Sequence, residues 1–378
     1  TTSLKGVEKV YRLFLPDYVV LTFIMMLGFY ILLRAFGISA WLAGLGGVIW
    51  AFSSYFFILI PAGHIWKFVT LAYIPPTIAG VVLAYRKKYL LGGIVTALFI
   101  ALQIQSNHIQ MSYYFMFVIL FFVGAYFEDA YRKKELPHFF KASGVLALAA
   151  VVGVCINISN LYHTYEYSKE TMRGKSELKQ EGAAASQTSS GLDRDYITNW
   201  SYGIGETLTL LVPNVKGGGS GSTMSQSEAA MAKANPMYNG IYSQLPQYFG
   251  EQPWTAGPVY VGAFVMFLFV LGCFIVKGPL KWALLGATIF SILLSWGKNF
   301  MGLTDFFIDY VPMYNKFRAV SSILVIAEFT IPLLAIFALK EILSKPDMLK
   351  QEKNCRGVIA ALVLTAGVAF ILAVAPGA

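Results

Sequence analysis

The sequence predicts an all-α polytopic membrane protein with about ten membrane helices and one large extracytoplasmic loop. Hydrophobic residues make up 57% of the 378 positions and charged residues only 13%, whereas a soluble domain carries roughly 25% charge. Apolar runs long enough to cross a bilayer recur along the chain. The basic residues collect in the short loops between these runs, which is how membrane proteins fix their orientation.

The apolar runs define the expected membrane spans. They lie at 18–36, 40–61, 71–86, 90–107, 109–127, 141–160, 257–276, 280–296, 320–341 and 357–375. Gly44, Gly46 and Gly47 interrupt the second run and Pro75-Pro76 the third, so either can be a broken or re-entrant helix. Before the first run, the apolar residues around Val10 and Phe14 line one side of a helix and are typical of an amphipathic helix at the membrane interface.

The basic loops set the orientation. Arg86-Lys87-Lys88, Arg132-Lys133-Lys134 and the stretch from Lys340 to Arg356 fall on one side, which the positive-inside rule makes cytoplasmic. The domain prediction that follows is an N-terminal membrane region, an extracytoplasmic loop domain and a C-terminal membrane region, at 1–160, 161–256 and 257–378. Within the loop, residues 216–236 are rich in Gly, Ser and Ala, which predicts a flexible segment. We expect the protein in a bacterial cytoplasmic membrane.

Other function classes fit poorly. The net charge of +9 is explained by basic residues that flank membrane spans, so we do not expect nucleic acid as a partner. Cys155, Cys273 and Cys355 lack the spacing of a disulfide or zinc framework. No two histidines stand four residues apart, and HExxH is absent, so we predict no metal site from the histidines.

Polar residues gather at the expected outer rim of the membrane. His64 follows the second span, and Asn107 and His108 form the turn between the fourth and fifth. His163, Asn157, Asn160, Glu166, Lys169 and Arg173 map to the same boundary. Polar groups at membrane depth are costly and usually line a cavity or bind something; the alternative is that they hydrogen-bond helix ends and ordered water.

The outer loop carries carboxylates beside aromatic residues. Asp193 and Asp195 precede Trp200, and Glu206 follows it. Such a mixture suits a sugar, whose apolar face stacks on the ring while its hydroxyls take hydrogen bonds. A carboxylate pair can also act as a general base or hold a divalent cation such as Mg or Mn. The alternative is a solvated turn whose aspartates cap a helix or pair with Arg194.

The ninth span holds two further charged candidates. Arg318, with Lys316 beside it, opens this span from the outer side. A guanidinium there can bind the phosphate of a lipid carrier in two places at once, although snorkelling to headgroups is an equal alternative. Glu328 lies well inside the span, where a carboxylate must be protonated, paired or beside a wet cavity.

Several segments carry a family resemblance over nearly the whole chain. They are Phe52-Ser53-Ser54-Tyr55-Phe56, Ala62-Gly63-His64, Tyr73-Ile74-Pro75-Pro76, Asn107-His108-Ile109-Gln110, Thr164-Tyr165-Glu166-Tyr167-Ser168, Arg173-Gly174-Lys175-Ser176, Ser190-Gly191-Leu192-Asp193-Arg194-Asp195-Tyr196, Trp200-Ser201-Tyr202-Gly203-Ile204-Gly205-Glu206, Gly257-Pro258-Val259-Tyr260-Val261-Gly262, Trp296-Gly297-Lys298-Asn299 and Tyr314-Asn315-Lys316-Phe317-Arg318. With these segments the chain resembles the YfhO-like family of bacterial multi-pass membrane proteins.

That family is similar to the GT-C class of glycosyltransferases. The resemblance implies transfer of a sugar from a polyprenyl-phosphate donor to a saccharide or lipid acceptor outside the cytoplasmic membrane. It also implies a catalytic carboxylate in the first outer loop. Before residue 18 this chain has only the interfacial stretch and no membrane span, so we expect that the family's first helix and most of that loop are missing from its N-terminus. Glu8 and Asp17 are the carboxylates that remain there, and we assign catalysis to neither.

Three functions therefore compete. In the first, the chain is a membrane glycosyltransferase in which His64, Asn107, His108, Glu166, Asp193, Asp195, Trp200 and Glu206 bind substrate, while Lys316 and Arg318 bind the lipid phosphate. The second is a transporter or flippase of a lipid-linked saccharide, with Glu328 and the broken helices along its path. The third is a non-enzymatic scaffold for envelope assembly. A single polar cavity at the outer rim would favour the first.

Overall fold

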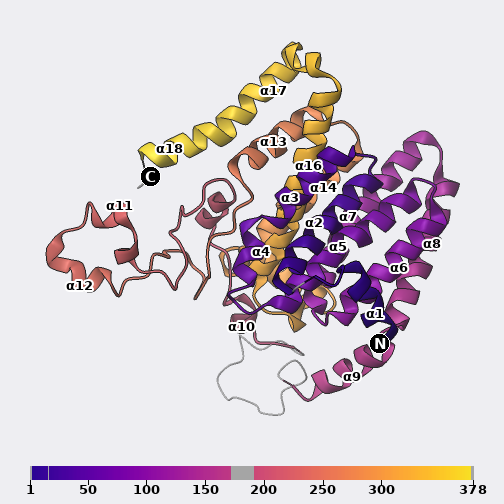
Figure 1. Cartoon of the computed structure of the whole chain (residues 1–378), viewed down its shortest axis with the longest axis horizontal. Coiled ribbons are helices and arrows are strands. Elements are labelled where there is room, and N and C mark those ends of the chain that lie inside the picture. Colours follow the sequence, from indigo (N-terminus) through magenta and orange to yellow (C-terminus); the bar gives the residue numbers. More distant parts are fainter. Residues whose placement is uncertain (1, 16, 172–190, 376–378) are drawn as a thin grey trace.

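The computed structural model describes residues 2–15, 17–171 and 191–375. In this part of the chain the regular secondary structure is helical, and one isolated β-bridge pairs Thr223 with Pro246. Most of the helices form one elongated bundle, with α9 and α10 at one end and the turn before α17 at the other (Figure 1). We refer to these as the α10 end and the α17 end. Arg173, and with it the segment 172–190 of the predicted loop, lies outside the described residues.

In the described ranges 2–15 and 17–171 the chain forms nine α-helices. They are α1 (Thr2–Tyr11), α2 (Asp17–Ala35), α3 (Ala40–Ala51), α4 (Ser54–Leu59), α5 (Ile65–Tyr85), α6 (Tyr89–Gln105), α7 (Ile109–Lys133), α8 (Leu136–Cys155) and α9 (Ile158–Lys169). The described part of the loop that follows has only short elements. They are α10 (Arg194–Thr198), η1 (Gly205–Leu210), η2 (Met224–Gln226), α11 (Glu228–Met231), η3 (Pro236–Tyr238) and α12 (Asn239–Tyr242).

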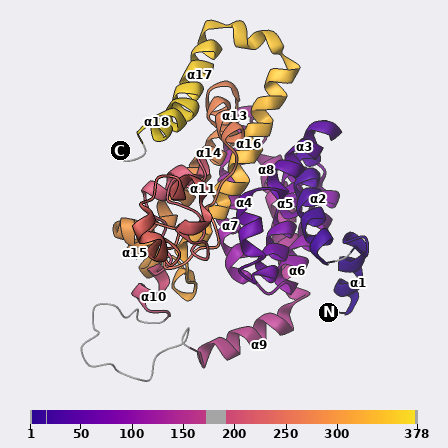
Figure 2. The same ribbon diagram turned by 60° about the vertical axis from the view of Figure 1, so that its left-hand side comes forward.

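The second half returns to longer helices. They are α13 (Ala263–Ile275), α14 (Pro279–Ser295), η4 (Gly297–Phe300), α15 (Met301–Tyr310), η5 (Tyr314–Lys316), η6 (Val320–Leu324), α16 (Val325–Ser344), η7 (Pro346–Lys350), α17 (Glu352–Leu362), the π-helical turn η8 (Val363–Gly367) and α18 (Val368–Val374). The last three are continuous and lie at the edge of the bundle, where α17 and η8 pack against α13 (Figure 2). Most of their surface is exposed, as expected of a helix that meets lipid rather than protein.

Among the described residues, five helical segments are long and apolar enough to cross a membrane. They are Ile65–Tyr85, Ile109–Lys133, Leu136–Cys155, Val320–Ser344 and Glu352–Val374. A sixth is possible if α14 and the helix after it count as one span, but the two are bent by 110°. Four apolar helices are shorter, at Val19–Ala35, Ala40–Ala51, Tyr89–Gln105 and Ala263–Ile275. The fold is thus all-helical with membrane-length helices, and the total of ten spans stays a prediction.

The second predicted span is indeed broken, but not at its glycines. The break falls at Phe52 and Ser53, between α3 and α4. The glycines instead allow close packing of α3 on α2. A Cβ atom at Gly47 would lie 2.7 Å from the backbone oxygen of Met26, so only glycine fits there. Helices in membranes use small residues in this way to bring their backbones together.

The third predicted span is continuous in spite of its prolines. α5 begins at Ile65 and runs through Pro75-Pro76 to Tyr85. Pro76 cannot donate to the Ala72 carbonyl one turn earlier. Gly28 of α2 faces this position, where an added Cβ would meet Pro76 Cδ at 3.1 Å. The absence of a side chain at Gly28 therefore lets α2 pack against the proline-containing turn.

α5 and α16 form the centre of the bundle. Both are buried over most of their length. Aromatic rings fill the space between the helices that surround them: Trp50 stacks on Phe29 with 5.4 Å between ring centroids and meets Phe329 edge-on at 5.6 Å. Edge-to-face and offset pairs of this kind add stability beyond their buried area.

Substitution of Gly47 tests this packing. Gly47→Ala should lower the free energy of unfolding by about 1–3 kcal/mol, because the new methyl group overpacks the contact with α2. Gly44 is the matched control, since nothing lies within 4 Å of its Cβ position. Gly44→Ala should be neutral or stabilising by up to about 1 kcal/mol through helix propensity. Thermal unfolding in detergent measures both, and equal melting temperatures for the two variants would contradict the proposed contact.

Candidate functional site

One cavity of about 410 Å³ lies at the α10 end of the bundle. Four separate stretches of the chain wall it: the turn between α4 and α5, the turn between α6 and α7, the long loop, and the segment that leads into α16. Its lining residues are Tyr55, Ile58, Leu59, Ala62, His64, Lys67, His108, Gln110, Trp200, Tyr202, Gln252, Trp254, Thr255, Ala256, Gly257, Val259, Arg318, Ala319, Ser321 and Ser322. Four of the residues predicted from sequence, His64, His108, Trp200 and Arg318, are thus brought together.

Backbone hydrogen bonds fix the long loop against the segment before α16. The Ala319 N–H donates to the Ile197 carbonyl oxygen at 3.2 Å, and the Ser321 N–H to that of Trp200 at 3.0 Å. Ala319 adopts the left-handed conformation, with φ 59°, which turns the chain so that these N–H groups face the loop. The pairing places Trp200 and Arg318 on the same cavity.

A second set of hydrogen bonds closes the wall near α4. The Ser54 hydroxyl donates to the Pro258 carbonyl oxygen at 2.8 Å and accepts from the Tyr260 N–H at 2.7 Å. The segment from Ala256 to Val259 therefore lies against the start of α4. The break between α3 and α4 helps to build the cavity wall, because it turns Ser54 toward the loop.

Both cavity histidines precede the first turn of a helix. His64 stands before α5 and His108 before α7. Burial lowers the pKa of His108 to about 4, and the Lys67 ammonium adds to the effect. Partial burial lowers the pKa of His64 as well, and the nearby Lys67 and Arg318 lower it further. Both imidazoles are therefore neutral at physiological pH, and within the described chain no group hydrogen-bonds His108 Nδ1.

Lys67 is the cavity residue that the sequence reasoning missed. Its residue is only 7% exposed, although it carries an ammonium group. Nζ donates to the Ser322 hydroxyl at 3.0 Å and lies 5.4 Å from the centroid of the Tyr55 ring. One signal could have found it: Lys67 stands three residues after His64, which places both side chains on one face of the first turn of α5.

Arg318 lies at the exposed rim of the cavity. Its guanidinium donates to the Tyr196 hydroxyl at 2.6 Å and lies 5.4 Å from the centre of that ring. The Arg318 carbonyl oxygen accepts from the Gln110 side-chain amide at 2.7 Å. Trp200 is oriented in a similar way, since its indole N–H donates to the Trp254 carbonyl oxygen at 3.1 Å. The cavity therefore presents aromatic surface close to two cations.

Six of the ten predicted binding residues do not line this cavity. Asn107 is exposed beside it. Glu166 lies on α9 and pairs with Lys169 at 2.7 Å. Asp193 caps α10 by accepting from the Asp195 N–H at 2.8 Å, and Asp195 itself is exposed. For Asp193 the structure therefore matches the capping alternative that the sequence left open.

Glu206 lies behind the cavity wall rather than on it. Its carboxylate is buried and accepts from the Gly203 N–H at 2.6 Å, the Tyr248 hydroxyl at 2.5 Å and the Glu251 N–H at 3.2 Å. Three donors of this kind satisfy a buried carboxylate. Glu206 therefore holds the segment 248–251 in place, close to cavity residue Gln252.

Lys316 and Glu328 also lie away from the cavity lining. Partial burial lowers the pKa of Lys316, which belongs to η5. Glu328 is fully buried in α16, where one carboxylate oxygen accepts from the Ser53 hydroxyl at the break between α3 and α4. Within the described chain, the other oxygen, Oε1, has no hydrogen-bond partner.

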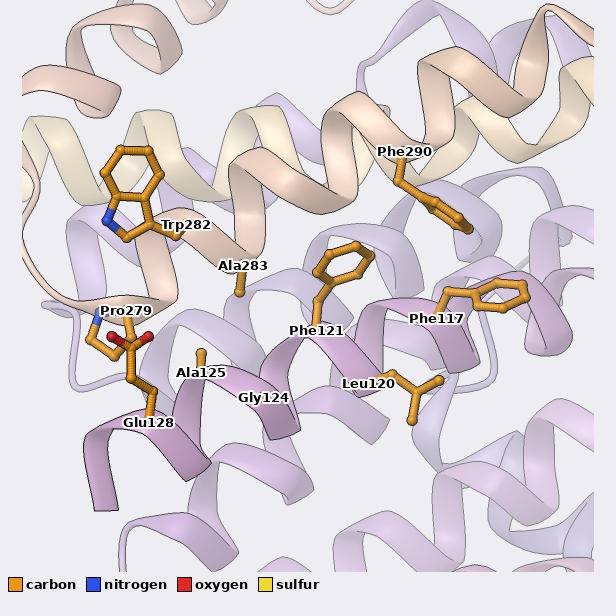
Figure 3. A pocket seen from close by; sticks show the side chains of 10 residues that line it. All are labelled: Phe117, Leu120, Phe121, Gly124, Ala125, Glu128, Pro279, Trp282, Ala283 and Phe290. Atoms are coloured by element: carbon orange, nitrogen blue, oxygen red, sulfur yellow. The ribbon is translucent and has the colours of Figure 1, made fainter. Parts of the chain in front are cut away.

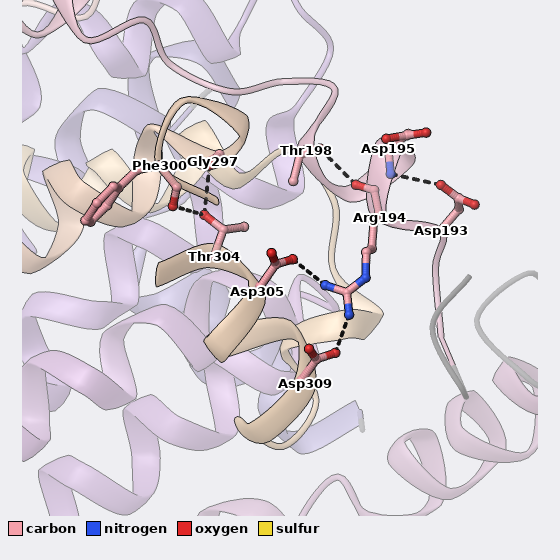
Figure 4. A network of polar contacts seen from close by, with 9 residues as sticks. All are labelled: Asp193, Arg194, Asp195, Thr198, Gly297, Phe300, Thr304, Asp305 and Asp309. Carbon is pink, nitrogen blue, oxygen red and sulfur yellow. Dashed lines mark hydrogen bonds and ion pairs between the residues drawn. The ribbon is translucent and has the colours of Figure 1, made fainter. Parts of the chain in front are cut away.

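An ion-pair network supports the loop next to the cavity. Arg194 of α10 reaches Asp305 and Asp309 on α15, the latter at 2.5 Å (Figure 4). The two aspartates stand one helical turn apart, so one guanidinium can bind both. The network docks α10 onto the second half of the bundle. From the sequence, Arg194 could have paired with its neighbours Asp193 or Asp195. In the structure its partners are instead Asp305 and Asp309, from a distant segment.

A different concavity runs between α7 and α14. It measures about 420 Å³, and its lining is apolar apart from Glu128 at one end. Figure 3 shows Phe117, Phe121 and Leu120 on one helix facing Phe290 and Ala283 on the other. Such a surface suits a hydrocarbon chain and offers a saccharide almost nothing to hydrogen-bond.

The charge of the first cavity limits its ligands. Lys67 and Arg318 are the strongly basic residues of the described lining, both histidines are neutral, and no described lining residue is a carboxylate. Across residues 2–15, 17–171 and 191–375, no group of three or more His, Cys, Asp or Glu residues is placed to hold a metal ion. The cavity is therefore chemically suited to an anion next to an aromatic surface.

Comparison of the chain with family models, with curated proteins and with solved structures finds no match.

Loss of the Arg194 network should destabilise the fold measurably. Arg194→Ala leaves Asp305 and Asp309 as neighbouring like charges, so we expect a loss of about 1–2 kcal/mol that shrinks as salt is added. Arg132→Ala is the control, because the Arg132–Glu128 pair is exposed within one helix and should contribute at most about 0.5 kcal/mol. Thermal unfolding at two salt concentrations tests this, and a salt-independent loss would argue for a packing effect instead.

The buried histidine predicts a pH dependence. An unfolded histidine titrates near about 6.5, above the pKa of about 4 for folded His108. Between these values only the unfolded state gains the proton, so the free energy of unfolding falls as pH falls. His108→Asn should reduce that loss by about 1–2 kcal/mol between pH 6.5 and 5. His163→Asn, on exposed α9, serves as control; parallel pH curves for wild type and His108→Asn would refute the assignment.

Proposed function

We propose that the chain is the membrane part of a glycosyltransferase that uses a polyprenyl-phosphate sugar donor on the outer side of the cytoplasmic membrane. The observation that carries the proposal is the cavity itself. It joins His64, His108, Trp200 and Arg318 from distant parts of the sequence and adds Lys67. Cations beside aromatic rings match a phosphate next to a sugar.

The proposed topology has ten spans. They are α2, α3 with α4, α5, α6, α7, α8, α13, α14, α16 and the continuous helix from α17 to α18. α5 begins at the cavity, so it ends on the far side of the bundle, where the basic run from Arg86 begins. Arg132 and Lys133 close α7 on that same side. The positive-inside rule then places the far side in the cytoplasm and the cavity outside.

The proposed reaction is displacement at the anomeric carbon. The acceptor hydroxyl oxygen forms a bond to that carbon, the bond to the phosphate oxygen breaks, and polyprenyl phosphate leaves with the electron pair. Negative charge grows on the leaving phosphate, and Arg318 at the rim is placed to stabilise it. The hydroxyl proton passes to a base that we do not assign to any described residue, because no carboxylate lines the cavity.

The saccharide acceptor and the sugar would share the aromatic side of the cavity. Trp200 and Trp254 both line it, and the hydrogen bond between them fixes the Trp200 ring. The apolar face of a pyranose stacks on such a ring. Gln110 and the neutral histidines supply hydrogen-bonding groups for hydroxyls. The apolar groove between α7 and α14 offers a surface for the hydrocarbon part of the donor.

One observation favours the alternative of a transporter. Glu328 is buried beside a broken helix, an arrangement that transporters use to bind substrates and coupling ions. However, Glu328 does not line the cavity, and Ser53 holds one of its oxygens. The sequence shows no internal repeat of the kind that alternating access needs. We therefore rank transport below transfer, with a non-enzymatic scaffold behind both.

Transfer from a radiolabelled polyprenyl-phosphate sugar, with the full-length protein in lipid nanodiscs, tests the proposal. Arg318→Ala should lower the rate about 10–100-fold, as expected when a charge-assisted phosphate contact is lost. Arg356→Ala is the control, because Arg356 is exposed and pairs only within α17 among the described residues. Turnover equal to wild type in Arg318→Ala would remove Arg318 from the phosphate site, and absence of transfer by the wild type would sink the transferase.

A further inference from the structure

The floor of the cavity holds an ammonium group without a described counter-ion. Lys67 is 7% exposed, and its one described hydrogen bond goes to the neutral Ser322 hydroxyl. No ion pair within the described part of the chain includes Lys67. Arg318, by contrast, is exposed at the rim. The two cations of the cavity therefore differ strongly in how much water reaches them.

A buried charge needs compensation. Taking an ammonium group out of water costs several kcal/mol unless a partner of opposite charge replaces the water or the group gives up its proton. An anion beside Lys67 is therefore what would keep it charged. The candidate carboxylate is Glu328, which lies near Tyr55, but its one described hydrogen bond is to Ser53. No described group of the chain therefore compensates the charge of Lys67. The side of its ammonium group that is not packed against protein faces the cavity.

Two further features of the floor suit a phosphate. His108 Nδ1 is buried without a described partner, and as the Nδ1–H tautomer it can donate to an oxygen atom. The Tyr55 ring lies under the ammonium at 5.4 Å and restricts it to one side. The hydrogen bond to the Ser322 hydroxyl holds the Lys67 Nζ atom from a second direction. A tetrahedral oxyanion can meet both donors at once, whereas a neutral sugar hydroxyl would leave the charge uncompensated.

We propose that Lys67, positioned by Ser322 and assisted by His108, is the phosphoryl-binding group of this cavity, and that its ligand is a phosphate ester. The inference rests on the proposed function and deepens it, because it moves the phosphate from the exposed rim to the buried floor. Arg318 then serves as a second, outer contact. With the phosphate on the floor, the sugar lies against Trp200 and Trp254, nearer the opening through which an acceptor enters.

The test is ligand-induced stabilisation of the full-length protein in phosphatidylcholine nanodiscs. Sodium phosphate and farnesyl phosphate are titrated separately against sodium chloride of equal ionic strength. Wild type should show a melting temperature that rises and saturates with at least one of the two phosphates. Lys67→Met should weaken the apparent affinity at least about tenfold, since a charge-assisted contact is lost. Lys67→Arg should keep part of the response, and Lys298→Met, a change at an exposed lysine, should keep all of it.

The unliganded proteins give a second measurement. Without phosphate, Lys67→Met should melt at or above the wild-type temperature, because the buried charge is gone; a lysine with only a structural role would give a lower one. A response to sodium phosphate identifies a free phosphate as sufficient, and a response to farnesyl phosphate alone identifies the lipid ester; both support the site. Equal responses of Lys67→Met and wild type, or no response of wild type to either phosphate, overturn it.

The two proposals fail separately. If Lys67→Met loses the phosphate response while no sugar is transferred by wild type, the phosphate site stands and the transferase falls. If Lys67→Met transfers sugar at the wild-type rate, the Lys67 site falls and the transferase stands.

Discussion

The architecture of the cavity depends on backbone hydrogen bonds between the long loop and the segment before α16. Backbone N–H and C=O groups that are buried away from water must find partners within the protein. Between η5 and η6 the chain is irregular, and Ala319 turns it through a left-handed conformation. The carbonyl oxygens of Ile197 and Trp200 accept the N–H groups that this turn exposes. The need to pair these backbone groups thus brings the loop aromatics and Arg318 together.

The same requirement explains the break between α3 and α4. Ending α3 leaves carbonyl and N–H groups without helical partners, and the short α4 that follows is held to the loop through Ser54. Ser53, at the break itself, donates to Glu328. In the sequence, Glu328 suggested a transport residue. Its carboxylate also has a structural role, because it accepts a hydrogen bond at the point where the helix is interrupted.

Much of the helical frame could be predicted from the sequence, because hydropathy records which segments avoid water. The run 90–107 corresponds to α6 (Tyr89–Gln105), and 18–36 to α2. α5 was placed six residues too late, at 71 instead of Ile65, since Lys67 lowers the apolar character of its first turn. The same lysine was then missed as a site residue. Its burial depends on Tyr55 and Ser322, which are distant in sequence, and no local pattern shows such contacts.

The polar residues of the site were likewise only partly predictable from the sequence. The two cavity histidines were predictable because a turn as short as the one around His108 must lie at the membrane boundary. Asp193, chosen as a carboxylate beside an aromatic residue, caps α10, and Glu206 serves the backbone behind the wall. What remains in the cavity is positive. A transporter must release its ligand on the far side, which is difficult for an anion held by a buried ammonium that lacks a competing carboxylate. A transferase gains from that arrangement, because fixed cations stabilise the charge that develops on a leaving phosphate more than the charge already present on the bound donor.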